Sequence, residues 1–208
     1  TRYQCDCSSD VCSSDLKVAT SAVFSEYELR KMAIKFASEE TATEASCVGS
    51  CSEEMDVRKV VKKCRGIEVK TRVKGSGTGK LSISMHVPKD TYDGMFGMRV
   101  EGLIDGVRAY GQSSTHPEFC ITQEVYDEDG NKKYKAYPRC IMESGVSRSI
   151  ENGSEEVKEV DLEISVMPDD YGQGMYEALD SELKEDTVKQ NWMSKFDPDT
   201  MYTSLSHA

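Results

Sequence analysis

The stretch VRAYGQSSTHPEFCITQEVYDEDGNKKYKAYPRCIM, residues 107–142, decides the fold. It contains two runs rich in β-branched and aromatic residues, 118–126 and 132–142, on either side of the polar sequence DEDGN. Such residues favour strands because they pack well on a pleated surface. The sequence therefore predicts a long β-hairpin in this part of the chain.

The polar sequence between the two runs has the chemistry of a short hairpin loop. Gly130 and Asn131 tolerate positive φ, and Asp127 and Asp129 can cap the turn through their side chains. Pro138 cannot donate a ladder hydrogen bond, so we expect it at an edge, a bulge or a strand end.

Residues 67–87 carry the clearest periodicity in the chain. Apolar residues alternate with polar ones at 67–73 and again at 81–87, which predicts a half-buried antiparallel sheet. The glycine-rich segment between the two runs is expected to be a flexible hairpin tip; it consists of Gly75, Ser76, Gly77, Thr78 and Gly79.

The remaining segments complete a mainly β plan. Residues 160–166 alternate in the same way and predict a strand whose outer face carries Asp161 and Glu163. Residues 89–97 predict a short helix with Asp90 as a possible N-cap. Residues 175–196 have apolar side chains at helical spacing and predict a C-terminal helix that includes Trp192.

Two N-terminal segments are less clear. Residues 17–36 fit either a helix or strands, and the polar segment 39–54 predicts a loop. The fold class expected is mainly β (α+β): an antiparallel β-sandwich or partial barrel with a short inserted helix and a C-terminal helical segment.

The chain divides into a leader, one domain and a tail. Residues 1–16 lack a hydrophobic period, and SSDVCSSDL at 8–16 resembles translated sequencing-adapter sequence, so we expect a non-native leader whose Cys5, Cys7 and Cys12 carry no chemistry. A native metal-binding arm is the alternative for this leader. We expect one domain over 17–199 and a loose tail at 200–208.

Charge is distributed unevenly along the 208 residues, whose net charge is −11. Residues 151–199 hold 15 acidic and four basic side chains, whereas residues 58–80 hold nine basic and one acidic. The two regions either attract each other between copies or are two solvated faces. The acidic total disfavours a DNA-coating role. We expect neither a signal peptide nor a membrane span, because the sequence shows no apolar run of about 20 residues.

No motif predicts a catalytic or cofactor site. The sequence GSGTGK at 75–80 lacks the first glycine and the following Ser or Thr of a phosphate-binding loop. Asp127, Asp129 and Asn131 have the spacing of calcium ligands, but Lys132 and Pro138 replace the required glycine and glutamate. We expect no enzyme, no cofactor and no metal.

The cysteines and histidines outside the leader do not change that expectation. Cys47, Cys51 and Cys64 have no zinc-site spacing, and Cys120 and Cys140 are expected to be packed free thiols, consistent with a reducing compartment. The three histidines are scattered along the sequence and predict no catalytic arrangement.

Taken as a whole, residues 67–196 resemble the major tail (tail tube) proteins of long-tailed phages and prophages of Gram-positive bacteria. The resemblance lies in AYG at 109–111, HPEFC at 116–120, DEDGN at 127–131, AYP at 136–138, IENG at 150–153, SVMPD at 165–169, YG at 171–172 and MY at 175–176. These strings have no catalytic meaning. The segment 39–54 has no counterpart that we can place.

The resemblance implies a virion structural protein without enzymatic activity or cofactor. It implies a β-sandwich subunit with a flanking helix, six copies in a ring, and rings stacked through loops and a long hairpin into a conduit for DNA ejection. The implied partners are further copies, tape-measure and tail terminator or initiator proteins, and passing DNA that is not held tightly. The implied location is the virion tail, assembled in the host bacterial cytoplasm, with no membrane contact.

Two sites follow from combining the resemblance with the residues. The glycine-rich segment at 75–79 is the candidate contact between rings. Asp161 and Glu163 are the candidate lumen-facing acids, because carboxylates repel DNA phosphates; Glu68 with Lys70, Arg72 and Lys74 forms a competing mixed face. The alternative function is a monomeric β-sandwich module that binds carbohydrate or protein through Tyr110, Tyr126, Tyr134 and Tyr137.

Overall fold

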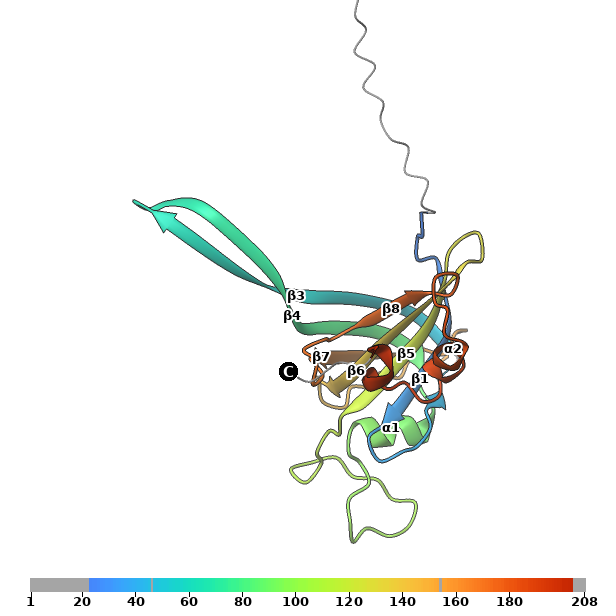
Figure 1. Cartoon of the computed structure of the whole chain (residues 1–208). Coiled ribbons are helices and arrows are strands. Elements are labelled where there is room, and N and C mark those ends of the chain that lie inside the picture. The colour runs from blue at the N-terminus through green and yellow to red at the C-terminus, as the bar shows by residue number, and fades with distance from the viewer. Residues whose placement is uncertain (1–22, 46, 154, 204–208) are drawn as a thin grey trace, which may run out of the picture.

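A computed structural model of the chain describes residues 23–45, 47–153 and 155–203, so the expected leader at 1–16 lies outside the described residues. The described strands are antiparallel neighbours in one eight-stranded sheet (Figure 1). The elements are β1 Glu28–Phe36, β2 Thr43–Glu44, β3 Cys47–Cys64, β4 Ile67–His86, α1 Lys89–Met95, β5 Phe119–Tyr126, β6 Lys132–Met142, β7 Val160–Met167, β8 Tyr176–Leu179, α2 Asp186–Trp192 and a 3-10 helix Pro198–Met201. The predicted mainly β fold with short helices is confirmed.

The sheet runs in the order β2-β1-β5-β6-β7-β4-β3, and β8 pairs with the part of β6 that β7 leaves open. It curls so that β1 and β3, near its two ends, come into contact. Of the two predicted forms, a partial barrel therefore describes it better than two separate sheets. None of the helices in the described ranges combines the length and the apolar character needed to span a membrane.

The predicted central hairpin is present as β5 and β6. Its loop is organised by Asp127, whose side chain accepts hydrogen bonds from the backbone N–H groups of Asp129 (3.0 Å) and Asn131 (2.7 Å). Pro138 lies at a bulge, where the register shifts between the pairs Ile121–Tyr137 and Phe119–Cys140. The loop is thus a capped hairpin turn, as the sequence predicts.

The core has two parts, one on each face of the central strands. Inside the curl, side chains from β1, β4, β5, β6, β7 and α1 form one cluster, which includes Phe119, Ile83 and Ile164. On the outer face of β5 and β6, Trp192 and Phe196 from the C-terminal segment cover Tyr134 and Ala136. Because both faces are covered, seven of the eight residues of β5 are buried.

Several local predictions were wrong. Residues 175–196 do not form one helix: the first part is β8, and only Asp186–Trp192 is helical. Tyr176–Leu179 is extended because β6 offers an unoccupied edge there, with Tyr134 opposite Ala178. The N-cap of α1 is Pro88, with Asp90 in the first turn.

The two N-terminal segments are also strands. The ambiguous residues up to Phe36 end in β1, and the predicted loop at 39–54 contains β2 and the start of β3. Small polar residues are tolerated in β3 because its backbone pairs with β4 along the whole length, while most of its side chains remain exposed. These segments form strands because neighbouring strands pair with them, although the local composition of 39–54 favours a loop.

Candidate assembly surface

The most prominent feature of the surface is a two-stranded ribbon that projects from the sheet (Figure 1). We call residues 57–75 the arm; it consists of the second half of β3 and the first half of β4. Its residues are exposed, apart from the half-buried Val61, and Ile67 at its end is 70% exposed. The arm ends in a tight turn at Arg65 and Gly66, whose φ angles of 50° and 81° match the positive values that a two-residue hairpin loop needs.

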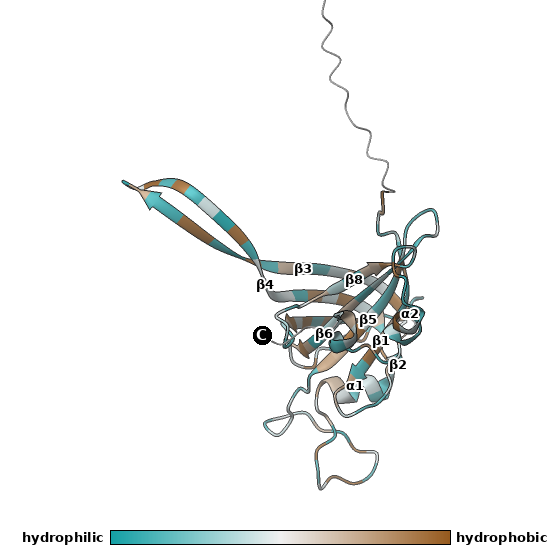
Figure 2. Ribbon diagram, in the orientation of Figure 1, coloured by the Kyte–Doolittle hydropathy of each residue, from teal (hydrophilic) through white to brown (hydrophobic). Residues whose placement is uncertain are grey.

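The two faces of the arm differ in chemistry. Directly paired residues share a face, and successive residues alternate between faces. The pairs Lys59–Val73 and Val61–Thr71 therefore lie on one face, which we call the valine face. The pairs Arg58–Lys74, Val60–Arg72 and Lys62–Lys70 lie on the other, which we call the basic face. Figure 2 shows this alternation as teal and brown bands along both strands.

The glycine-rich segment 75–79 lies at the base of the arm, so the prediction of a hairpin tip there was wrong. It is an interior part of β4, and the register shifts here between Met55 and Val57. A Cβ on Gly77 would lie 2.7 Å from the Gly172 carbonyl oxygen, so glycine permits close packing against the turn before β8. Gly77 and Gly79 thus permit close packing, whereas a side chain at Gly75 would meet open space.

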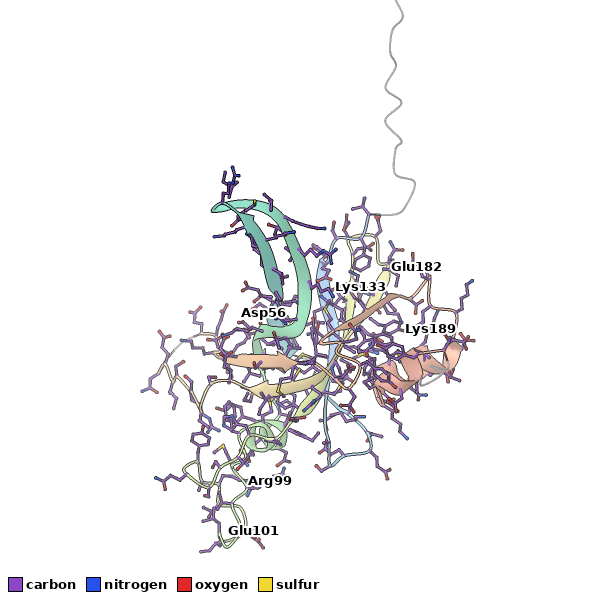
Figure 3. All side chains as sticks on the ribbon, turned by 60° about the vertical axis from the view of Figure 1, so that its left-hand side comes forward. Asp56, Arg99, Glu101, Lys133, Glu182 and Lys189 are labelled. Carbon is purple, nitrogen blue, oxygen red and sulfur yellow. The ribbon has the colours of Figure 1, made fainter. Side chains whose placement is uncertain are left out.

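Two hydroxyl groups hold this base to the opposite strand. Ser76 donates to the Asp56 carbonyl oxygen (3.0 Å), and Thr78 donates to the Asp56 carboxylate (2.8 Å). Figure 3 shows Asp56 where the arm meets the body. The arm therefore leaves the sheet at a defined bend.

The outer face of β4 and β7 is polar, and both candidate acids lie on it as predicted. Ser82 donates a hydrogen bond to Glu163 (2.8 Å), and Ser84 donates one to Asp161. Lys80 on the same strand forms an exposed ion pair with Glu143 (2.7 Å). This face is a hydrated array of serine and carboxylate side chains, and whether it lines a lumen stays a prediction.

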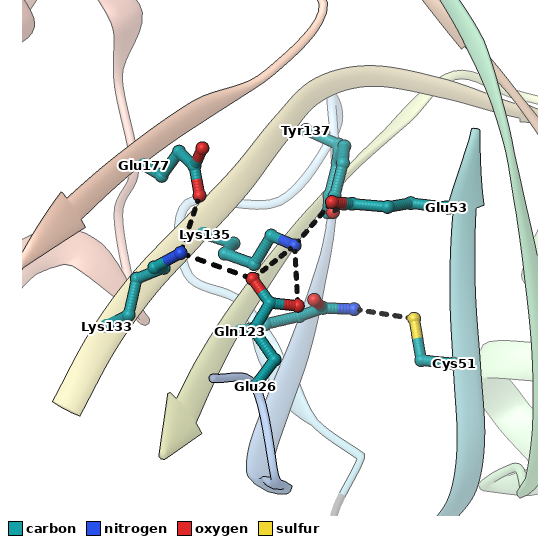
Figure 4. A network of polar contacts seen from close by, with 8 residues as sticks. All are labelled: Glu26, Cys51, Glu53, Gln123, Lys133, Lys135, Tyr137 and Glu177. Carbon is teal, nitrogen blue, oxygen red and sulfur yellow. Dashed lines mark hydrogen bonds and ion pairs between the residues drawn. The ribbon is translucent and has the colours of Figure 1, made fainter. Parts of the chain in front are cut away.

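A network of charged groups fills the gap between β1 and β3 (Figure 4). The buried Lys135 ammonium contacts Glu53 (2.6 Å) and Glu26 (3.1 Å), and Tyr137 donates a hydrogen bond to Glu53. Burial by itself would lower the pKa of Lys135, but the carboxylates of Glu53 and Glu26 outweigh it and raise the pKa. Lys135 is thus held charged inside the curl.

The same network lowers the pKa of Glu26. Burial would raise that pKa, but hydrogen bonds and charges from Lys135 and Lys133 outweigh it. Gln123 extends the network by donating to the Cys51 sulfur (3.3 Å). A cavity of about 460 Å³ lies beside these groups. Because the ammonium already has two carboxylate partners, we assign the network a structural role.

The remaining titratable candidates are also structural. Cys120 and Cys140 are free and buried as predicted, and burial raises the pKa of Cys120 to about 12. His116 lies between the Tyr110 hydroxyl (3.1 Å) and the Met142 carbonyl (3.0 Å). Within the described ranges, no group of three or more His, Cys, Asp or Glu side chains is placed to hold a metal ion.

The tyrosines proposed for ligand binding do not form an exposed platform. Tyr134 and Tyr137 are buried in the two core clusters, Tyr126 is half-buried, and Tyr110 is 45% exposed. The arm as a unit was not predicted from the sequence. The signal for it was the eight basic side chains at 58–74, which a buried sheet does not accommodate.

Comparisons with known proteins give weak matches among solved structures alone. No protein-family profile matches the chain, and no curated protein matches it. Among solved structures, the chain is similar to a cryo-EM structure described as the anti-feeding prophage cap (AFP tube terminating cap). The TM-score is 0.44 with 10% sequence identity, and the match covers 79% of this chain and 99% of that chain. A match at this level supports no conclusion about function.

Proposed function

We propose that this protein is a structural subunit of a phage-type tail, of the tail-tube kind, that assembles with copies of itself. The observation that carries the proposal is the arm. A ribbon with exposed valines and eight basic side chains gains little inside one subunit, because neither of its faces packs on the body. The arm can bury its exposed valines and pair its basic side chains only when another molecule covers it.

Two further features support self-assembly. The outer edge of β3 in the body has no strand partner among the described strands, and such an edge is a pairing surface for a neighbouring copy. The polar face with Asp161 and Glu163 suits a wet lumen, since its carboxylates are exposed and repel phosphate groups. The resemblance of residues 67–196 to tail tube proteins agrees with both.

The finer proposal is a hexameric ring that stacks into a tube. In it, the arm and its base at 75–79 contact the adjacent ring, and DNA passes along the acidic face without tight binding. Tape-measure and terminator or initiator proteins are the proposed partners, and the virion tail, assembled in the host cytoplasm, is the proposed location. The chain itself carries out no chemistry.

The test is to image purified protein by negative-stain electron microscopy before and after concentration, with mass photometry alongside. We expect rings or tubes with a central hole. A variant in which residues 58–74 are replaced by Asn-Gly should lose stacking, while Arg65→Asn, which keeps positive φ at the turn, should retain it. A protein that stays monomeric when concentrated, and also when terminator or initiator protein is added, would contradict the proposal and favour a monomeric binding module.

A further inference from the structure

An acidic groove with apolar rims lies at one end of β7. It has a volume of about 1050 Å³ and is lined by the loop before β7 together with Ser84 and His86 of β4. Ile150 and Val157 line it and are 91% and 83% exposed. The groove therefore presents two exposed apolar side chains beside its carboxylates.

The groove has the opposite charge to the arm. Glu151 and Glu159 are among its lining residues, against Lys158, while Asp161 marks the border between the groove and the outer face of β7. Glu155, also exposed, lies in the same loop. The arm carries eight basic side chains and one acidic one, a net charge of +7. Surfaces of opposite charge and matching apolar content are complementary in an interface.

The two features lie at opposite ends of one strand. The arm contains the first residues of β4, Ile67 to Gly75, whereas Ser84 and His86 at its last residues line the groove. Twenty extended residues span about 65 Å, so the arm cannot fold back into the groove of its own chain. A second copy in the same orientation, displaced along β4, presents its groove to the arm.

We infer that the arm of one copy binds the acidic groove of the next through its basic face, with the exposed Val60 of that face near Ile150 and Val157 and the basic side chains toward the glutamates. This inference rests on the proposed self-assembly and names the surface that receives the arm. The contact is heterologous, because different surfaces of the two copies meet. It therefore propagates in one direction and does not close a pair.

The test uses two charge-reversed proteins. The first has a reversed arm, Lys62→Glu with Lys70→Glu, two residues that pair directly on the basic face. The second has a reversed groove, Glu151→Lys with Glu159→Lys. Each lacks one half of the contact and should not stack alone. When the two proteins are mixed, the normal arm of the second can bind the normal groove of the first. We therefore expect association in the mixture to be at least tenfold tighter than in either protein alone. Sedimentation velocity measures this difference.

Two controls make the result specific. Lys184→Glu with Glu185→Lys reverses two exposed charges outside both surfaces and should leave assembly unchanged. A single chain that carries both reversals should stack again, since its arm and groove are complementary once more. Association of the mixture should weaken when salt is raised to about 1 M, where charges are screened within about 3 Å.

A second measurement does not depend on the reversed charges. Cys64 pairs with Ile67 at the end of the arm, so a bismaleimide should link it to a Val157→Cys variant of another copy, and Cys64→Ser should abolish that product. Tubes from wild-type protein without pairing in the mixture would overturn the inference and leave the proposed function intact. Pairing in the mixture without rings or tubes would support the inference and count against the proposed function.

Discussion

The two halves of β4 carry the same alternation of apolar and polar residues, but the apolar side chains are buried in one half and exposed in the other. In the second half, Leu81, Ile83 and Met85 are at most 2% exposed and belong to the inner core. In the first half, Val69 and Val73 are 55% and 56% exposed and belong to the arm. The comparison teaches that alternation identifies a face, whereas burial needs a partner for that face.

The first prediction contrasts these halves directly. Ile83→Ala should lower the free energy of unfolding by about 3 kcal/mol, because it leaves a cavity in the core. Val73→Ala, on the arm, should change it by less than about 0.5 kcal/mol. Urea unfolding at one pH measures both. Equal losses for the two variants would show that the arm is packed against the body in solution.

The second prediction concerns the ion network of the body. Lys135→Ala leaves Glu53 without its ammonium partner and leaves Glu26 paired with Lys133 alone, which should cost about 2 kcal/mol. The remaining pair and the half-exposed Glu26 keep the figure below that of a fully buried pair. Lys184→Ala, at an exposed position, is the matched control. If the two lysine variants unfold at the same urea concentration, the network contributes nothing.

The third prediction is a pH dependence from Glu26. Its pKa in the folded protein lies below the ordinary glutamate value of 4.5, so its contribution to stability is complete above pH 4.5 and is lost as the pH falls through the lower folded value. Wild type should therefore lose stability below pH 4.5 more steeply than Glu26→Gln. Parallel unfolding curves of the two proteins from pH 6 to pH 3 would argue against the assignment.

The fourth prediction tests the outer face of the sheet. The Trp192 indole donates to the Lys135 carbonyl (3.1 Å) and packs beside Tyr134. Trp192→Phe keeps most of the packing but removes the donor, so we expect a loss of about 1 kcal/mol in thermal or urea unfolding. Trp192→Ala should cost clearly more, and no difference between the two would mean that packing is unimportant here.

The smallest effect on stability is expected from removing the arm. Replacing residues 58–74 by Asn-Gly should shift the free energy of unfolding by less than about 0.5 kcal/mol, because the deleted residues are almost all exposed. Calorimetry measures this shift on the same protein used to test assembly. A large destabilisation would mean that the arm supports the body, and loss of tubes could then not be assigned to a missing contact.

Much of the fold could be predicted where a residue's own chemistry decides the conformation. The DEDGN turn was predictable because Asp127 caps the loop from within it, and the strand at 160–166 was predictable from its period of two. The candidate site was predicted less well: Asp161 and Glu163 are on the expected outer face, but the tip of the hairpin is at Arg65 and Gly66 instead of 75–79. Glycines that permit flexibility and glycines that permit close packing are identical in sequence.

The sequence by itself determined the alternating strands, the central hairpin, the short helix after Pro88 and the separation of basic and acidic charge. The tertiary structure alone decided that β8 is a strand, that β4 continues through its glycines, and that Lys135 meets Glu26 and Glu53. The reason is physical. Periodicity and turn chemistry act between neighbours in the chain, whereas an open sheet edge or a buried charge is satisfied by whichever distant segment the fold brings beside it.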